Sequence, residues 1–201
     1  MKTNNILLSV LLVVSIILLL KLLTSYDESE YITSSIDNKK YLIRNLHTNE
    51  RKNIETANTL AIVNQKVTLL IQELTGPNEL YFVKYLRENF KGNPISEAAL
   101  DHNQTSYTIN KQAIHLCLRS RDHRQELYDI NDIMYVVLHE LGHMCNYSKD
   151  GEPIQGHGPE FKMKFRFLVN EAIKLGLYTY HDYTNNPKHY CGMKITSNII
   201  D

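Results

Sequence analysis

Residues 129–145 read DINDIMYVVLHELGHMC, and they contain the pentapeptide His139-Glu140-Leu141-Gly142-His143. The stretch has no proline, and its apolar residues recur at three- and four-residue steps, which is typical of a helix with one buried face. These residues are Ile130, Ile133, Val137, Leu141 and Met144. Asp129 and Asn131 are candidate caps for the first turn. We therefore predict a core helix over this stretch.

The pentapeptide predicts a metal site on that helix. Residues four apart project from one face, so the imidazoles of His139 and His143 can reach a single ion. Glu140 lies beside the first histidine and can act on a metal-bound water. The sequence pattern His-Glu-x-x-His also occurs by chance, and its helical setting is what favours a zinc site over a chance match. Gly142 costs about 1 kcal/mol in a helix interior, which indicates either close approach of another segment or a tolerated glycine.

A catalytic zinc ion usually has three protein ligands and one open position. Residues 156–161 read GHGPEF, and His157 within this run is the predicted third ligand. The two glycines allow a tight turn, and Pro159 suits the first position of a new helix. Helical spacing of apolar residues continues to Leu175. A loop between two antiparallel helices would bring His157 back over the first helix.

Two carboxylates on the second predicted helix are alternatives to His157. Other zinc peptidases take a glutamate from a following helix, which would make Glu171 the ligand here. Glu160 lies on about the same face. An ordinary solvated helix face explains both glutamates equally well, and the spacing favours His157.

Together, HELGH and GHGPEF resemble the SprT-like (Spartan-type) zinc metalloproteases and, more loosely, the related WLM metallopeptidases. The resemblance covers about residues 107–175. It implies that His139, His143 and His157 bind one Zn²⁺ ion and that Glu140 is catalytic. The implied fold is α+β and zincin-like, with helices packed on a small sheet. The chain shows neither the C-terminal zinc ribbon of some members nor a recognisable DNA-binding extension.

These residues predict a zinc metallopeptidase that hydrolyses peptide bonds of protein or peptide substrates through a zinc-activated water. Glu140 would take the proton of the water and pass it to the leaving amine. Two alternatives stay open: a non-catalytic, zinc-stabilised binding domain, and an SprT-like protease that acts on DNA-bound proteins. The formal net charge is +0 and no basic run is present, so there is no clear nucleic-acid site.

An oxyanion-stabilising donor is also needed, and the segment after the second helix is rich in candidates. These are Tyr178, Tyr180, Tyr183, Tyr190, His181 and His189. An aromatic packing segment is the simpler interpretation of each one, because proximity in sequence is not a geometric role.

Residues 105–119 read TSYTINKQAIHLCLR. Apolar residues alternate from Ile114 to Leu118, which predicts a strand with one apolar face. A turn at Asn110-Lys111 would join it to a short strand at 107–109. In zincin-type enzymes the strand before the metal helix edges the cleft and pairs with extended substrate. His115 is on the polar side, as expected of an exposed strand residue.

The rest of the chain predicts scaffold. Amphipathic patterns predict helices at about 60–74 and 80–90, and a last strand is expected within 188–195. Three cysteines, at positions 117, 145 and 191, are an odd number and predict no disulfide framework.

At the N-terminus, residues 6–20 are apolar except for Ser9 and Ser15. We expect residues 1–24 to form a transmembrane anchor, with a cleaved signal peptide as the alternative. Residues 25–50 would be a polar tether and residues 51–201 the metallopeptidase domain. The chain would then be a single-pass membrane protein, with its catalytic domain on an undetermined side.

Overall fold

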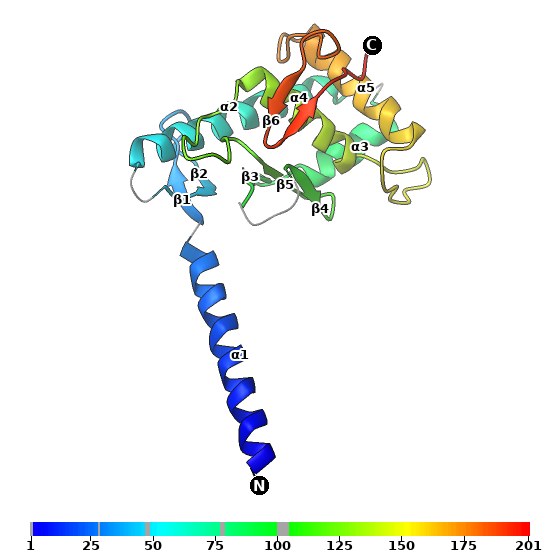
Figure 1. Ribbon diagram of the computed structural model, residues 1–201. Helices are drawn as coiled ribbons and strands as arrows, with labels where there is room; N and C mark the ends of the chain where they lie inside the picture. Colours follow the sequence, from blue (N-terminus) through cyan, green and yellow to red (C-terminus); the bar gives the residue numbers. More distant parts are fainter. Residues whose placement is uncertain (1, 28, 47–48, 77–78, 100–104) are drawn as a thin grey trace.

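Helices account for more of the regular structure than strands, and the strands are short (Figure 1). The computed structural model describes residues 2–27, 29–46, 49–76, 79–99 and 105–201; within helix α1 it describes the side chains of residues 7–20. The elements are α1 (Lys2–Asp27), β1 (Ser29–Thr33), β2 (Lys40–Arg44), α2 (Glu50–Leu74), α3 (Tyr81–Asn89), β3 (Ile95–Glu97), β4 (Tyr107–Ile109), β5 (Ala113–Leu116), α4 (Ile130–Met144), α5 (Pro159–Lys174), β6 (Lys188–Tyr190) and β7 (Met193–Ile195).

The strands form small sheets between the helices. β1 pairs with β2, and β6 pairs with β7, both antiparallel. The remaining sheet has the order β3-β5-β4, with β3 parallel and β4 antiparallel to β5. β4 lies at an edge of this sheet and contacts α4. The chain is therefore mixed α/β, and its strands at 107–109 and 113–116 lie where alternation predicts them.

Helix α4 has the predicted position and cap. The side chain of Asp129 accepts a hydrogen bond from the main-chain N–H of Asn131, which satisfies a donor at the helix start. The predicted apolar stripe is buried, with Ile133, Val137, Leu141 and Met144 all at 0% exposure. α4 packs against α5, which begins with Pro159 in its first turn as expected. These two helices place the loop that carries His157.

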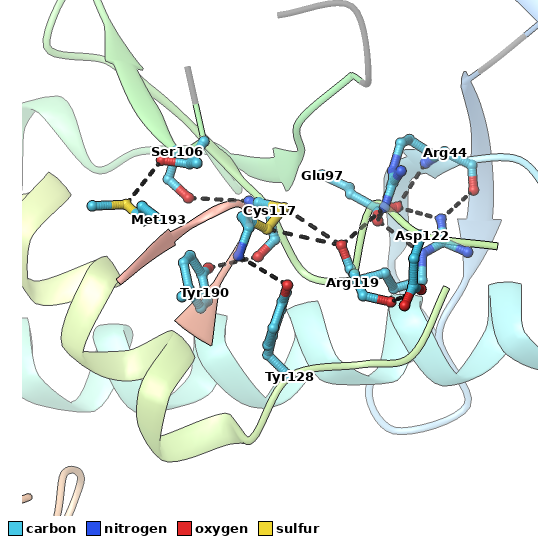
Figure 2. Close-up of a disulfide and its surroundings, with 12 residues drawn as sticks. Arg44, Glu97, Ser106, Cys117, Arg119, Asp122, Tyr128, Tyr190 and Met193 are labelled. Carbon is cyan, nitrogen blue, oxygen red and sulfur yellow. Dashed lines mark hydrogen bonds and ion pairs between the residues drawn. A yellow bond between two sulfur atoms is a disulfide. The ribbon is translucent and has the colours of Figure 1, made fainter. Parts of the chain in front are cut away.

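Much of the predicted polar tether at 25–50 is folded, because strands β1 and β2 lie within it. β1 and β2 form a hairpin whose Tyr41 and Ile43 belong to the hydrophobic core. Arg44, at the end of β2, donates a hydrogen bond from its main-chain N–H to Glu97 at 2.8 Å. Glu97 also pairs with Arg119, which is fully buried (Figure 2). A buried charge is costly unless it is paired, so this Arg-Glu-Arg group joins the hairpin to β3 and to the segment after β5.

A disulfide joins Cys117, just after β5, to Cys191, in the turn between β6 and β7 (Figure 2). The expectation of no disulfide framework is therefore wrong. The two Cα atoms are 6.3 Å apart and the bond spans 74 residues of sequence. Cys145 is the buried free cysteine. An odd number of cysteines leaves one thiol over, but it does not prevent the other two from pairing.

The transmembrane prediction is also wrong. In the part of the chain that the structure describes, no helix is both long enough and apolar enough to cross a bilayer. The side chains of residues 7–20 of α1 are exposed. This corrects both the anchor at 1–24 and the single-pass localisation.

Candidate metal centre

Helix α4 and the loop that follows it bring three histidines together. The Nε2 atoms of His139 and His143 are 3.2 Å apart. Nε2 of His157 lies 3.0 Å from each of them. His157 is exposed, and the other two rings are partly buried. The structure thus brings together all three residues that the sequence predicts as ligands.

The spacing of these nitrogen atoms fits one zinc ion. The three atoms form a nearly equilateral triangle, and its centre lies ~1.8 Å from each nitrogen, close to the Zn–N distance of about 2.0–2.1 Å. Three ring nitrogens that face one another need a proton or a cation between them, because neutral imidazoles would otherwise oppose lone pairs. A three-histidine donor set is typical of catalytic zinc sites.

Burial keeps two of the histidines in the form that binds metal. It lowers the pKa of His139 to about 3, and the nearby His143 and His157 contribute further. The pKa of His143 is lowered to about 4, mainly by burial and then by His157 and Lys111. A histidine must be neutral to bind a metal. His139 and His143 are therefore ready to bind at neutral pH.

The aromatic ring of Phe161, on α5, touches all three imidazoles. Its centroid lies 4.9 Å from that of His139, 4.4 Å from that of His143 and 4.7 Å from that of His157. Phe165, one turn later, lies 5.2 Å from His139. Because this packing restricts the rings, α5 holds the ligand set in one arrangement.

Gly142 permits this close packing. A Cβ atom at this position would lie 3.0 Å from Cε2 of Phe161 and 3.4 Å from Cβ of Phe165. Contacts of that length are tighter than ordinary van der Waals separation. The glycine at position 142 is therefore explained by the close approach of α5, and not as a residue that the helix merely tolerates.

Glu140 is buried beside the histidines, with 4% of its surface exposed. The hydroxyl of Thr108 donates a hydrogen bond to Oε2 of Glu140 at 2.7 Å. Burial raises the pKa of Glu140 to about 7, although the Thr108 hydrogen bond acts in the opposite direction. A carboxyl group with such a pKa can both accept and release a proton near neutral pH.

Two lysines hold the loop between α4 and α5. Lys111 Nζ donates to the main-chain carbonyls of His143, at 2.9 Å, and Ile154, at 3.0 Å. Lys164 is fully buried, and its Nζ donates to Oδ1 of Asn146 and to the carbonyl of Tyr147. Burial lowers the pKa of Lys111. Both ends of the loop are fixed to the body of the protein, and His157 lies close to its second end.

The histidines and Glu140 line a cleft of about 940 Å³. Other parts of its lining are residues 105–108 around β4, residues 155–157 of the loop, and residues 191–193 of the β6–β7 turn. This volume falls in the range of sites that bind organic ligands. The candidate metal centre is therefore accessible from solution through this cleft.

The two alternative ligands lie elsewhere. Glu160 forms an ion pair with Lys164 at 3.3 Å, and Glu171 forms one with Lys174 at 2.6 Å. In the described residues, the group able to hold a metal around His157 contains histidines only. The side chain of Glu160 is 53% exposed and that of Glu171 is 23% exposed, and each lies in an ion pair on α5.

Two of the candidate oxyanion donors have packing roles. Tyr183 and Tyr190 are buried, and their hydroxyls donate to Asp132 and to the main-chain carbonyl of Cys117. Within the described parts of the chain, the cleft lining includes none of Tyr178, Tyr180, Tyr183, Tyr190, His181 and His189. The predicted turn at Asn110-Lys111 is present, since both residues have positive φ angles.

Sequence reasoning does not single out Thr108 or Lys111. Period-two alternation places Thr108 on the face of its strand opposite Tyr107, but a three-residue strand is too short for that signal to stand out. The two carbonyl acceptors of Lys111 come from two segments that meet only in the folded chain. No local pattern reveals such a contact.

The chain resembles several viral proteins. It is 34% identical to the uncharacterized protein R325 of Acanthamoeba polyphaga mimivirus over 206 aligned residues, which cover 98% of this chain and 99% of that protein. The chain belongs to the same family as this mimivirus protein. The similarity to R325 extends over nearly the whole length of both chains, so it includes the α4–α5 region and the N-terminal segment alike.

Two further relatives match shorter regions. The chain is 34% identical over 102 residues to the uncharacterized protein 136R of Invertebrate iridescent virus 6, covering 49% of this chain and 52% of that protein. It is 34% identical over 121 residues to the uncharacterized protein 042R of Invertebrate iridescent virus 3, covering 59% and 69%. No protein-family model and no solved structure matches the chain.

Proposed function

We propose that this protein is a zinc-dependent metallopeptidase that hydrolyses peptide bonds of protein substrates. One observation carries the proposal: three Nε2 atoms converge to within 3.2 Å of one another beside a buried carboxylate, and all of these groups line one cleft. The motifs HELGH and GHGPEF support an SprT-like type of peptidase, and we extend the proposal to that relationship.

His139, His143 and His157 would hold the ion. Zinc bound there supplies a Lewis acid that polarises a peptide carbonyl and lowers the pKa of a coordinated water to about 7. Glu140 accepts a proton from the attacking water at its carboxylate and returns it to the nitrogen of the leaving amine.

β4 supports an extended peptide as the substrate. It lies at the edge of the β3-β5-β4 sheet, and its residues Tyr107 and Thr108 line the cleft. An edge strand can pair with an added chain through main-chain hydrogen bonds, which depend little on the side chains of the added chain. The substrate would then be an unfolded or locally extended protein segment.

The test uses the full chain, purified with zinc, and casein as an extended protein substrate. Wild type and Glu140→Gln are compared, with Glu171→Gln as a matched surface control. We expect one zinc per chain in all three by elemental analysis. Casein cleavage should occur in wild type and the control, stop when a chelator removes the metal, and be absent in Glu140→Gln.

Each other outcome points to a different function. Equal cleavage by wild type and Glu140→Gln contradicts the proposed mechanism. One zinc per chain without cleavage of any protein substrate favours a non-catalytic binding domain. Cleavage that needs added DNA favours a protease of DNA-bound proteins, which a salt titration checks because phosphate contacts weaken as salt rises.

A further inference from the structure

Thr108 and Glu140 are in contact although 32 residues separate them in sequence. Oγ1 of Thr108 lies 2.7 Å from Oε2 of Glu140 and 3.2 Å from its main-chain oxygen. A hydroxyl has one proton to donate. The shorter distance and the charge of the carboxylate favour Oε2 as the acceptor. The carboxylate is thereby fixed from outside its own helix.

The register of β4 directs Thr108 toward α4. Successive side chains of a strand point to opposite faces of the sheet. Tyr107 is on the outer face, where its ring stacks on that of His115 with centroids 4.9 Å apart. Thr108 is paired with Ile114, whose side chain is fully buried on the inner face. The direction of the hydroxyl therefore follows from the sheet pairing.

A glutamate side chain has three rotatable bonds, and a proton acceptor must stay in place to act efficiently. Glu140 is nearly inaccessible to solvent, so water contributes little to holding it. A hydrogen bond at Oε2 leaves Oε1 as the oxygen that can face the attacking water. This geometry matters for catalysis only if Glu140 moves the proton.

We propose that Thr108 is a positioning residue whose hydroxyl holds Oε2 of Glu140, so that the carboxylate stays aligned for proton transfer. The inference rests on the proposed peptidase function. Because Thr108 belongs to the strand that edges the cleft, the same strand contacts the substrate region and orients the proton acceptor. Thr108 acts through Glu140 and not on the substrate itself.

The experiment compares Thr108→Val, which removes the hydroxyl at nearly constant shape, with Thr108→Ser, which keeps it. Thr56→Val is the matched control, because Thr56 is a buried threonine on α2 whose hydroxyl donates to the carbonyl of Lys52. We expect Thr108→Val to lower kcat on casein by about tenfold to a hundredfold, the range typical for a residue behind a reacting group. KM, zinc content and melting temperature should stay unchanged. Thr108→Ser should recover most of kcat.

Two results overturn the inference while leaving the proposed function intact. In the first, Thr108→Val retains wild-type kcat although Glu140→Gln is inactive. In the second, the zinc content or the melting temperature of Thr108→Val falls in proportion to its activity. The second result would mean that Thr108 has a structural role. Full activity in Glu140→Gln is a separate result, which refutes the peptidase mechanism and the role of Thr108 together.

Discussion

At the scale of single residues, the pKa of Glu140 links the proposed chemistry to stability. Its folded-state pKa is raised to about 7 from an ordinary value of 4.5, mainly by burial. The stability that this shift contributes is fully present below pH 4.5 and is lost as the pH rises through 7. The loss amounts to about 3 kcal/mol in the metal-free protein, since each unit of pKa corresponds to ~1.4 kcal/mol.

The measurement is the free energy of urea unfolding of the metal-free wild type minus that of metal-free Glu140→Gln. We expect this difference to fall by about 3 kcal/mol from pH 4.5 to pH 8, because the glutamine stays neutral throughout. The subtraction removes the opposite contribution of His139 and His143, whose lowered pKa values favour folding as pH rises. Parallel pH curves for the two proteins would show that Glu140 titrates normally.

His157 and Glu171 give a direct test of the ligand set. His157→Ala should weaken zinc binding by at least about a hundredfold, because it removes one of three ligands. Glu171→Gln should leave zinc affinity unchanged, since Glu171 pairs with Lys174 and lies apart from the histidine cluster. Competition with a chromophoric chelator measures both affinities. A loss of affinity in Glu171→Gln alone would restore the glutamate as the third ligand.

At the scale of elements, the contact between α4 and α5 depends on Gly142. Gly142→Ala gains about 1 kcal/mol of helix propensity, but its Cβ meets the Phe161 ring at 3.0 Å. Because that ring packs on all three histidines, we expect zinc affinity to fall about tenfold while the helix content by circular dichroism is kept. Undiminished affinity would show that Phe161 can shift without moving the imidazoles.

The loop after α4 explains how a histidine fourteen positions beyond His143 returns to it. Lys111 fixes the carbonyls of His143 and Ile154, one on each side of the loop. Lys164 fixes Asn146 and Tyr147 near its start. Two buried lysines thus hold the loop through main-chain carbonyls and the Asn146 side chain, an arrangement that limits the mobility of residues next to the candidate metal centre.

At the scale of the whole molecule, the disulfide joins the C-terminal hairpin to the segment after β5 and thus to the wall of the cleft. A bond across 74 residues restricts the unfolded chain, which corresponds to about 4 kcal/mol in the chain-entropy model. We expect Cys117→Ser with Cys191→Ser to lower the free energy of unfolding by roughly this amount and to lower the melting temperature. Cys145→Ser is the single-thiol control, and equal stability with and without a reducing agent would contradict the prediction.

Some features of this protein follow from sequence alone. The 3.6-residue periodicity of Ile133, Val137 and Leu141 is a local property, and it predicts α4 and its buried face. The four-residue spacing of His139 and His143 puts both rings on one face wherever that helix forms. The glycines and Pro159 around His157 predict a turn and a new helix, which α5 begins as expected.

Other features depend on residues that meet only in the folded chain. The apolar run at the N-terminus predicts a helix, but not whether that helix crosses a bilayer, because the decision depends on its length and surroundings as well as on composition. Arg44 ends the second strand of the β1–β2 hairpin, and it is buried by pairing with Glu97, 53 residues away. The Cys117–Cys191 bond and the hydrogen bond from Thr108 to Glu140 have no local signal for the same reason. Periodicity and spacing act within one element, whereas charge pairing, disulfide formation and the orientation of the Glu140 side chain require two elements to be packed together.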